Sequence, residues 1–326
     1  MVGLMPWLPL ILLSIWPSVG QTVTVTSNQL AWPVAFSQPW ALINSSFGPR
    51  LQASKNNRYD FHRGIDILGT TADPVLAMAD GEIITMYAED DPESTYLTSG
   101  NVIVLRHTWL TPYRFHKQNL TTYYTHYLHL DRFSDGLAVG TSVSQGDILG
   151  YIGSTGDTEV EHLHFEVRLG TSCSLESNCN TTGFDPHVNP LLFLDYPQTN
   201  TVKLRLRKSG KQLRARIKIP GDEQDFNRIK ITAENRRGRV MASQIINFNS
   251  RVGLDPSSTA TLDSATYDDV TIVPQSFSQS TKYKTIRFDV KKVFTSQVHS
   301  VTVTLTDIHG QRLKQRHLKK NRIKHS

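Results

Sequence analysis

The chain has 326 residues, of which 38% are hydrophobic and 9% aromatic, so it can build one or two ordinary cores and is not an intrinsically disordered protein. Its net charge of +6 hides an uneven distribution, because residues 1–200 carry 9 Lys and Arg against 19 Asp and Glu, whereas residues 201–326 carry 26 against 10. This break, near "LDYPQTN", predicts a boundary between an acidic first domain and a basic second domain.

The chain begins with an apolar segment that is typical of a signal peptide. The run "LPLILLSIW" is followed by Pro17 and by the small residues Ser18 and Gly20, which favours cleavage before Gln21. An uncleaved anchor is the alternative, but the run has about half of the ~20 apolar residues that a membrane span needs. No later segment is long and apolar enough to span. We therefore expect residues 1–20 to be a signal peptide and the mature protein to be secreted, extracellular and without a membrane span.

Short runs rich in Val, Ile, Tyr and Thr fill both halves of the remaining chain, separated by Gly, Asp, Asn and Pro. They are "PVLAMAD", "GEIITMYA", "NVIVLRHT", "TTYYTHYLHL", "DILGYIG" and "HLHFEVRL", and then "VKLRLR", "LRARIKI", "RIKITAEN", "YKTIRFDV" and "VHSVTVTLTDIHG". The patterns predict an all-β protein. We expect an antiparallel β-sheet domain at 21–198, a basic β-sandwich of Ig-like type at 199–312, and a basic tail at 313–326.

Two features fit an oxidising, secretory route. Cys173 and Cys179 lie in the loop-like stretch "GTSCSLESNCNTTG", where a disulfide would close a small loop. Sequons at Asn44, Asn119 and Asn180 are candidate glycosylation sites.

Three segments carry side chains that suit metal chemistry. In "FHRGIDI", His62 and Asp66 stand four residues apart around Gly64, which lets the backbone turn so that both side chains can face one point. In "HLHFEV", His162 and His164 are two residues apart on a predicted strand and project from one face. One of this pair could bind a metal while the other reaches the water on that metal.

The third segment, "YLHLDRF", adds His129 from another predicted strand. Each motif alone is commoner as a surface feature than as a metal site. Together they supply two histidines and one carboxylate, a known catalytic zinc ligand set that leaves the fourth position to water. No "HExxH" glutamate is present, and we expect Glu166, two residues after His164, to be structural or to support a ligand.

The ordered blocks "SSFGPR", "HRGIDI", "PVLAMADGEI", "GNVIVLRH", "YLHL", "VGTSVSQGDILGYIGSTGDT" and "HLHFEVR" resemble the lysostaphin-type (LytM-like) zinc endopeptidases over about residues 47–194. The usual substrate of that family is bacterial cell-wall peptide. The resemblance implies a compact β-sheet core with the site in a groove bounded by loops. It also implies that His62, Asp66 and His164 are the ligands of Zn2+.

The same resemblance implies that His129 and His162 are the catalytic histidines, which orient the water, accept its proton and stabilise the oxyanion. His126 competes with His129, but "YLHL" fits the Tyr-x-His-Leu pattern of the family better than "YTHY", and the two histidines would face opposite sides of a regular strand. The segments "AEDDPESTYLTSG", "TWLTPYRFHKQNLTT" and "GTSCSLESNCNTTGFDPHV" are longer than in typical bacterial members and are expected to be loops that shape the groove.

Two functions from different classes follow. The first is a secreted zinc metalloendopeptidase that acts on peptidoglycan cross-links; the family resemblance implies glycine-containing or D-amino-acid peptides as substrates. The alternative is a non-catalytic, zinc-binding signalling or surface-binding protein, similar to the animal leukocyte-chemotaxin relatives of the same fold. The presence of both His129 and His162 beside a full ligand set favours the enzyme.

The basic second half, including "RLKQRHLKKNRIKHS", indicates attraction to a polyanion such as a bacterial surface polymer or a sulfated glycan. A solubilising basic surface is the alternative. Nucleic acid is a less favoured polyanion, and the sequence shows no interleaved aromatic pattern that would favour single-stranded nucleic acid.

Overall fold

The structure of the protein is a computed structural model. It describes residues 30–52, 58–94, 98–115, 117–170, 186–198, 201–220, 224–247, 260–261, 271–279, 283–290 and 297–319. Within these ranges strands dominate, as the sequence predicts, and no helix is long and apolar enough to cross a membrane.

Several predicted features fall outside those ranges. The signal peptide, Cys173, Cys179 and Asn180 lie outside the described residues. Asn44 and Asn119 are described and exposed, on β1 and β8 respectively. Their glycosylation stays a prediction.

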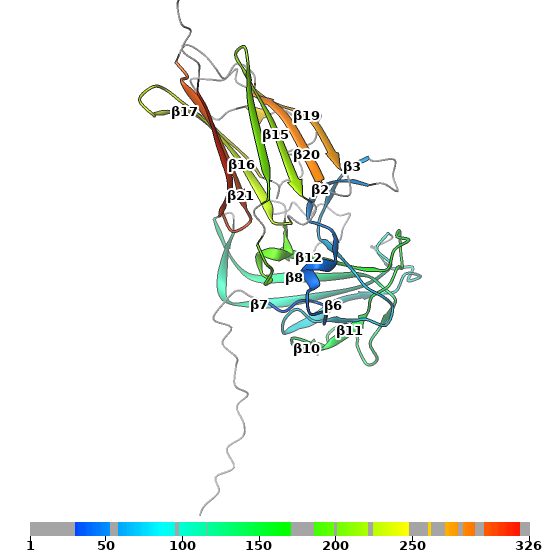
Figure 1. Ribbon diagram of the computed structural model, residues 1–326. Coiled ribbons are helices and arrows are strands. Elements are labelled where there is room, and N and C mark those ends of the chain that lie inside the picture. The colour runs from blue at the N-terminus through cyan, green and yellow to red at the C-terminus, as the bar shows by residue number, and fades with distance from the viewer. Residues whose placement is uncertain are drawn as a thin grey trace, which may run out of the picture.

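An antiparallel sheet forms the centre of the first domain, and Figure 1 shows β7, β8 and β12 running side by side through it. The strands lie in the order β1-β4-β12-β8-β7-β6-β10, and β13 pairs with β12 beyond the end of β4. Their bounds are β1 (Ile43–Ser45), β4 (Ile65–Leu68), β6 (Gly81–Tyr87), β7 (Asn101–Phe115), β8 (Gln118–Leu130), β10 (Ser142–Val143), β12 (His162–Leu169) and β13 (His187–Val188).

Smaller elements complete the first domain. A second sheet has the order β5-β11-β9, and β2 pairs with β3 as a separate hairpin. Their bounds, with those of two 3-10 helices, are β2 (Gly48–Gln52), β3 (Arg58–His62), β5 (Pro74–Leu76), β9 (Arg132–Phe133), β11 (Ile148–Tyr151), η1 (Pro39–Leu42) and η3 (Pro190–Leu192).

Strand β12 has one apolar face and one polar face. Leu163, Phe165 and Val167 are fully buried in the apolar core of the first domain. The residues between them, including His164 and Glu166, project from the other face because successive side chains alternate along a strand. Burial of the apolar set therefore fixes the register that brings the polar side chains together.

The segment "TWLTPYRFHKQNLTT", expected to be a loop, is instead the outer part of the β7–β8 hairpin. Strand β7 continues to Phe115, and β8 begins at Gln118. Trp109 stacks on Tyr123 with ring centroids 4.1 Å apart and approaches Phe193 at 5.4 Å. This aromatic packing extends both strands past the point where the alternation of apolar residues weakens.

Two sheets in the second domain share one apolar core, which makes this domain a β-sandwich. One has the order β14-β15-β20-β19-β18 and the other β17-β16-β21-β22. The bounds are β14 (Lys203–Ser209), β15 (Gln212–Pro220), β16 (Phe226–Glu234), β17 (Val240–Asn247), β18 (Ala260–Thr261), β19 (Thr271–Gln279), β20 (Tyr283–Val290), β21 (Ser300–Asp307) and β22 (Arg312–Lys319). This order is compatible with the predicted Ig-like arrangement, which stays a prediction.

Part of the predicted basic tail belongs to the sandwich. Strand β22 pairs with β21 along its length, and Leu313 is buried in the shared core. The expected start of the tail at residue 313 is therefore wrong for residues 313–319. With mostly polar residues in "RLKQRHLK", the pattern is too weak to reveal an edge strand that is held mainly by backbone pairing.

Candidate metal centre and active site

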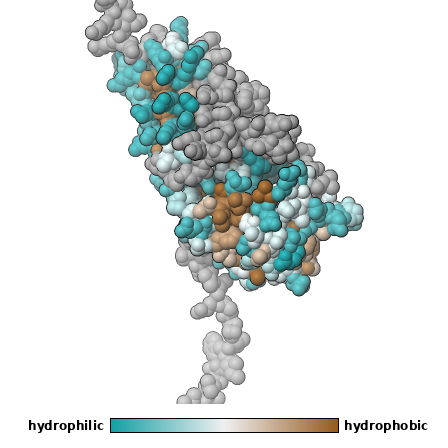
Figure 2. All heavy atoms as spheres, turned by 45° about the vertical axis from the view of Figure 1, so that its right-hand side comes forward, coloured by the Kyte–Doolittle hydropathy of each residue, from teal (hydrophilic) through white to brown (hydrophobic). Residues whose placement is uncertain are grey.

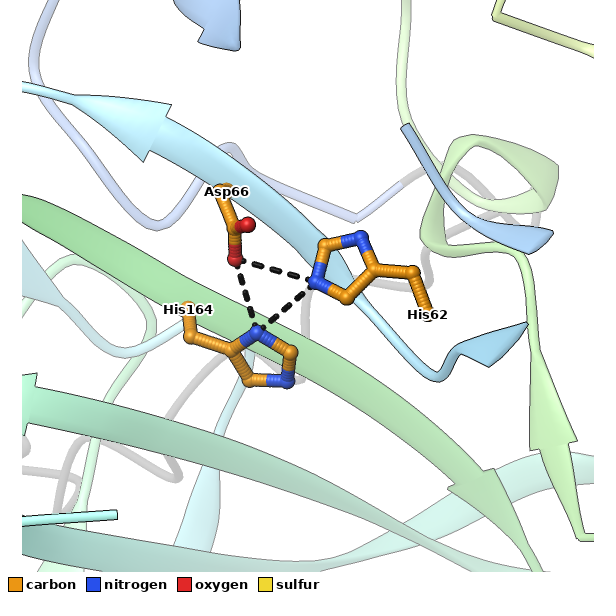
Figure 3. Close-up of side chains that lie close together, drawn as sticks. All are labelled: His62, Asp66 and His164. Carbon is orange, nitrogen blue, oxygen red and sulfur yellow. Dashed lines mark hydrogen bonds and ion pairs between the residues drawn. The ribbon is translucent and has the colours of Figure 1, made fainter. Parts of the chain in front are cut away.

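Three side chains from separate segments meet at one point (Figure 3). His62 ends β3, Asp66 lies on β4, and His164 lies opposite Asp66 on β12. Oδ1 of Asp66 lies 3.0 Å from Nε2 of His62 and 2.8 Å from Nδ1 of His164, and the two ring nitrogens are 3.0 Å apart. The three residues predicted as ligands thus form a triangle of donor atoms that could hold a metal ion.

Gly64 allows the chain between His62 and Asp66 to pass close against β12. A Cβ at this position would lie 2.3 Å from the backbone oxygen of Phe165 and 3.0 Å from Nε2 of His164. The sequence predicts a turning role for Gly64, but the structural requirement is the absence of a side chain. Any larger residue would push the two ligand-bearing segments apart.

Hydrogen bonds on the outer side of both rings leave lone pairs directed into the triangle. Nδ1 of His62 lies 3.0 Å from the carbonyl oxygen of Ser46, which can only accept, so in the neutral ring Nε2 carries no proton. Nε2 of His164 lies 3.0 Å from the carboxylate of Glu166, which leaves Nδ1 bare in the neutral ring. Two bare nitrogens beside a carboxylate oxygen repel one another unless a positive charge lies among them. The chemistry of the donor set therefore fits a cation.

Two histidines and one carboxylate suit zinc in particular. Ligand bonds of ~2.0–2.1 Å in a tetrahedron place the ligand atoms ~3.3 Å apart, which is close to the 2.8–3.0 Å separations found here. The side chains of Asp66 and His164 are each 12% exposed. Solvent therefore reaches the centre, and a fourth position is accessible to water or substrate.

The protonation of the triangle also favours a cation. Burial lowers the pKa of His62 to about 4. Burial opposes ionisation of Asp66, but His62 and His164 hold the pKa of its carboxyl well below the usual range. Burial lowers the pKa of His164, yet the carboxylates of Asp66 and Glu166 more than offset this and raise it to about 9. Without a metal, His164 therefore carries a proton that supplies the positive charge of the site. A metal ion must displace this proton to bind, so metal affinity falls as the pH is lowered.

Arg50 fixes the carboxylate of Asp66. Nη1 of Arg50 donates to Oδ2 of Asp66 at 3.1 Å and to the hydroxyl of Ser45 at 3.0 Å. With Oδ2 engaged, Oδ1 is the oxygen directed at the two rings. Arg50 belongs to the "SSFGPR" block, but its contact with Asp66 was not predicted, because β2 and β4 lie in different sheets.

Two further histidines are tied to backbone carbonyls beside the triangle. Nδ1 of His129 donates to the oxygen of Thr155 at 2.8 Å, and Nδ1 of His162 donates to the oxygen of Val160 at 2.7 Å. In the neutral rings each Nε2 is then a proton acceptor. Nε2 of His162 lies 3.5 Å from Oδ1 of Asp66, and the ring centroids of His129 and His162 are 4.9 Å apart. The structure thus brings both predicted catalytic histidines to the metal triangle.

A left-handed backbone conformation distorts β8 at His129. The φ angle there is 63°, a value that few residues other than glycine adopt. Leu128 pairs opposite His164, so on a regular strand the next side chain would point to the other face. The backbone N–H of His129 donates to the oxygen of Ser99 at 2.9 Å, outside the regular ladder. Together with the bond to Thr155, this contact holds the distorted strand and its ring beside the centre.

His126, the competing candidate, lies deeper in the fold. It pairs opposite Glu166 in the register of β8 and β12 and is fully buried. Burial, reinforced by the charge of Arg168, lowers the pKa of His126 well below its usual value. A fully buried ring cannot reach solvent or substrate, so the geometry favours His129.

Glu166 connects His164 to a buried arginine. Its two carboxylate oxygens accept from Nε2 of His164 at 3.0 Å and from Nε of Arg168 at 2.7 Å. Burial raises the pKa of Glu166, but Arg168 and His164 hold it well below the usual range. The ionised carboxylate fixes the orientation and the tautomer of the His164 ring, the supporting role expected for Glu166.

Replacing Glu166 with glutamine should weaken zinc binding by ~10–100-fold, the usual effect of losing a partner behind a metal ligand. The variant also leaves Arg168 buried without a counter-charge and should unfold more easily. Zinc affinity is therefore measured by competition with a chromophoric chelator at a temperature where both proteins are folded. Glu82→Gln, which loses a carboxylate that is paired with Arg106 at the surface, serves as the control. Unchanged affinity in Glu166→Gln would contradict the supporting role.

Residues 60–177, which include all five site residues, match the model of a family described as peptidase family M23. The chain is 30% identical over 124 residues to the peptidoglycan DD-endopeptidase ShyC of Vibrio cholerae and 32% identical over 125 residues to the glycyl-glycine endopeptidase ALE-1 of Staphylococcus capitis. Each alignment covers 38% of this chain, but 24% of ShyC and 28% of ALE-1. The chain thus spans about a quarter of the length of these relatives.

Solved structures show a weaker likeness. Lysostaphin from Staphylococcus simulans is 18% identical with a TM-score of 0.34, over 78% of this chain and 92% of lysostaphin. A zinc-containing peptidase from Vibrio cholerae is 25% identical with a TM-score of 0.31, over 44% of this chain and 36% of that one.

Proposed function

We propose that residues 60–177 form a peptidase family M23 domain and that the protein is a secreted, extracellular zinc metalloendopeptidase that hydrolyses peptide bonds in bacterial peptidoglycan cross-links. One observation carries this proposal. Three potential metal ligands converge beside two histidines whose unprotonated Nε2 atoms can accept a proton. The names of ShyC and ALE-1 support a substrate class of D-amino-acid or glycine-containing cross-link peptides.

The chemistry divides between the two groups of side chains. A bound zinc would lower the pKa of a coordinated water toward ~7 and polarise the scissile carbonyl. His129 and His162 each present an acceptor nitrogen, so either ring can take the proton of the attacking water. A ring that has gained this proton donates at both nitrogens and can stabilise the oxyanion or pass the proton to the leaving amine. The carbonyls of Thr155 and Val160 keep both rings in this orientation.

A non-catalytic, zinc-binding signalling or surface-binding protein needs the three ligands alone. It does not need the left-handed backbone at His129, which costs ~1–3 kcal/mol in a residue other than glycine. That strained conformation is held by two hydrogen bonds and sets the ring beside His162. Strain at this position therefore favours catalysis over a scaffold role.

Digestion of purified peptidoglycan sacculi tests the proposal. The full-length protein should release soluble peptides with new amino termini, detected by mass spectrometry. A chelator should stop the release, and added zinc should restore it, whereas His162→Ala should stay inactive with zinc present. Binding to sacculi without new amino termini would favour the non-catalytic alternative and overturn the peptidase proposal.

The second domain has a targeting role in this proposal. Its basic charge would concentrate the protein on a polyanionic surface, because Lys and Arg contacts to a polyanion release counterions. The five site residues all precede this domain in the chain, so hydrolysis and targeting are separable functions.

A further inference from the structure

The outer face of β14 and β15 carries arginines directly opposite one another. Arg205 pairs with Arg216, and Arg207 pairs with Arg214, in one continuous antiparallel register. The alternate residues of both strands are mostly apolar and lie in the sandwich core. All four arginines therefore project from one face of the sheet. We call these four residues the arginine ladder.

Little on this face compensates the charge of the arginine ladder. Arg214 Nε lies 3.9 Å from a carboxylate oxygen of Asp289. Among the residues that the structure describes, Arg205 and Arg207 form no ion pair, and the buried Nε of Arg216 has no hydrogen-bond acceptor. Like charges directly opposite one another destabilise a sheet. A bound anion would remove this repulsion.

The spacing of the ladder suits a linear polymer. Alternate residues of a strand are ~6.6–6.8 Å apart and neighbouring strands ~4.8 Å apart, so the four guanidinium groups form a flat grid. A chain with one negative charge every ~7 Å can follow such a strand. Guanidinium groups match phosphate oxygens in a two-point geometry, which favours phosphodiester charges.

The same face argues against single-stranded nucleic acid. Proteins that bind it without sequence preference stack bases on aromatic side chains. The outward positions of the two strands carry no aromatic residue; apart from Pro220 they are all polar or charged. Hydrophilic residues cover most of the described surface of this domain that is visible in Figure 2. Along β14 and β15 the face offers charge and hydrogen bonds, but no surface for stacking.

We propose that the arginine ladder binds the phosphodiester backbone of an anionic bacterial cell-wall polymer and so holds the peptidase domain at its substrate. The choice of a wall polymer rests on the proposed function, because such polymers lie on the same surface as peptidoglycan. The location of the binding face rests only on the register, the charge and the scarcity of compensating acids among the described residues.

The test uses the full chain and two variants that remove equal charge. The ladder variant carries Arg205→Gln, Arg207→Gln and Arg216→Gln. The matched control carries Arg236→Gln, Arg237→Gln and Arg239→Gln, which are exposed in the turn between β16 and β17. Affinity for purified poly(glycerol phosphate) is measured by titration at several salt concentrations, and single-stranded DNA with the same number of phosphates is titrated in parallel.

The ladder variant should lose at least ten-fold in affinity for poly(glycerol phosphate), and the slope of log affinity against log salt should fall by about 2. The control should lose less than about three-fold. Equal losses in both variants would show a net-charge effect and overturn the ladder. Tighter binding of DNA than of the wall polymer would overturn the proposed partner.

Hydrolysis of a soluble peptide is measured beside binding for each protein. It should be unchanged in the ladder variant, since the site lies in the other domain. If the native protein binds the polymer through the arginine ladder but does not hydrolyse the peptide, the peptidase proposal is contradicted and the binding proposal is not.

Discussion

Replacing His164 with alanine should remove most of the bound zinc and abolish hydrolysis of peptidoglycan peptides. His164 supplies one of the three donor atoms, and its Nδ1 lies within 3.0 Å of both others. Losing a direct ligand should cost more than the ~10–100-fold in metal affinity that losing a partner behind it costs. Zinc per chain is measured by atomic emission after dialysis against a metal-free buffer.

The control for this variant is His317→Ala, which removes an exposed histidine from β22 and should keep native zinc content. Thermal unfolding of both metal-free proteins shows whether the fold survives. Full zinc occupancy in a folded His164→Ala protein would refute the ligand assignment, whatever its activity.

Replacing His129 or His162 with alanine should have the opposite pattern, with zinc retained and the rate lowered by ~10²–10⁴-fold, the usual range for acid–base groups. Neither ring is a member of the donor triangle, and each is held by a backbone carbonyl. Steady-state hydrolysis of a soluble cross-link peptide gives the rate, and metal content is measured on the same samples.

His126→Gln separates the two candidate histidines of β8. His126 is fully buried, so the variant should lose stability but keep nearly native activity per folded molecule at low temperature. His129→Gln should keep stability within about 1 kcal/mol and lose activity. The reverse outcome would show that the regular alternation of the strand, and not its distortion, places the catalytic ring.

Much of the site was predictable from local patterns. The spacing of His62 and Asp66 and the His-x-His alternation of β12 indicate side chains that share a point or a face. Most strands follow from alternating or β-branched runs, because the apolar residues of each run must enter a core. The charge break predicts a basic second domain, because the charge of a segment can be counted from its sequence without knowledge of the fold.

Other features depend on contacts between residues far apart in the chain, and only the tertiary structure decided them. The φ angle of His129 is stabilised by Ser99 and Thr155, whereas regular alternation along β8 would put His126 on the site face. Arg50 reaches Asp66 from another sheet, and aromatic stacking turns an expected loop into the end of β7 and β8.

The arginine ladder also combines a feature that the sequence reveals with one that only the fold determines. Its charge is visible in the sequence "KLRLRKSGKQLRARIKIP", but the alignment of like charges is set by the pairing register of β14 and β15. The chain by itself determined which groups are present and which face of each strand is apolar. Folding decided which of those groups meet, because backbone pairing and burial of the core fix the register while the polar side chains follow.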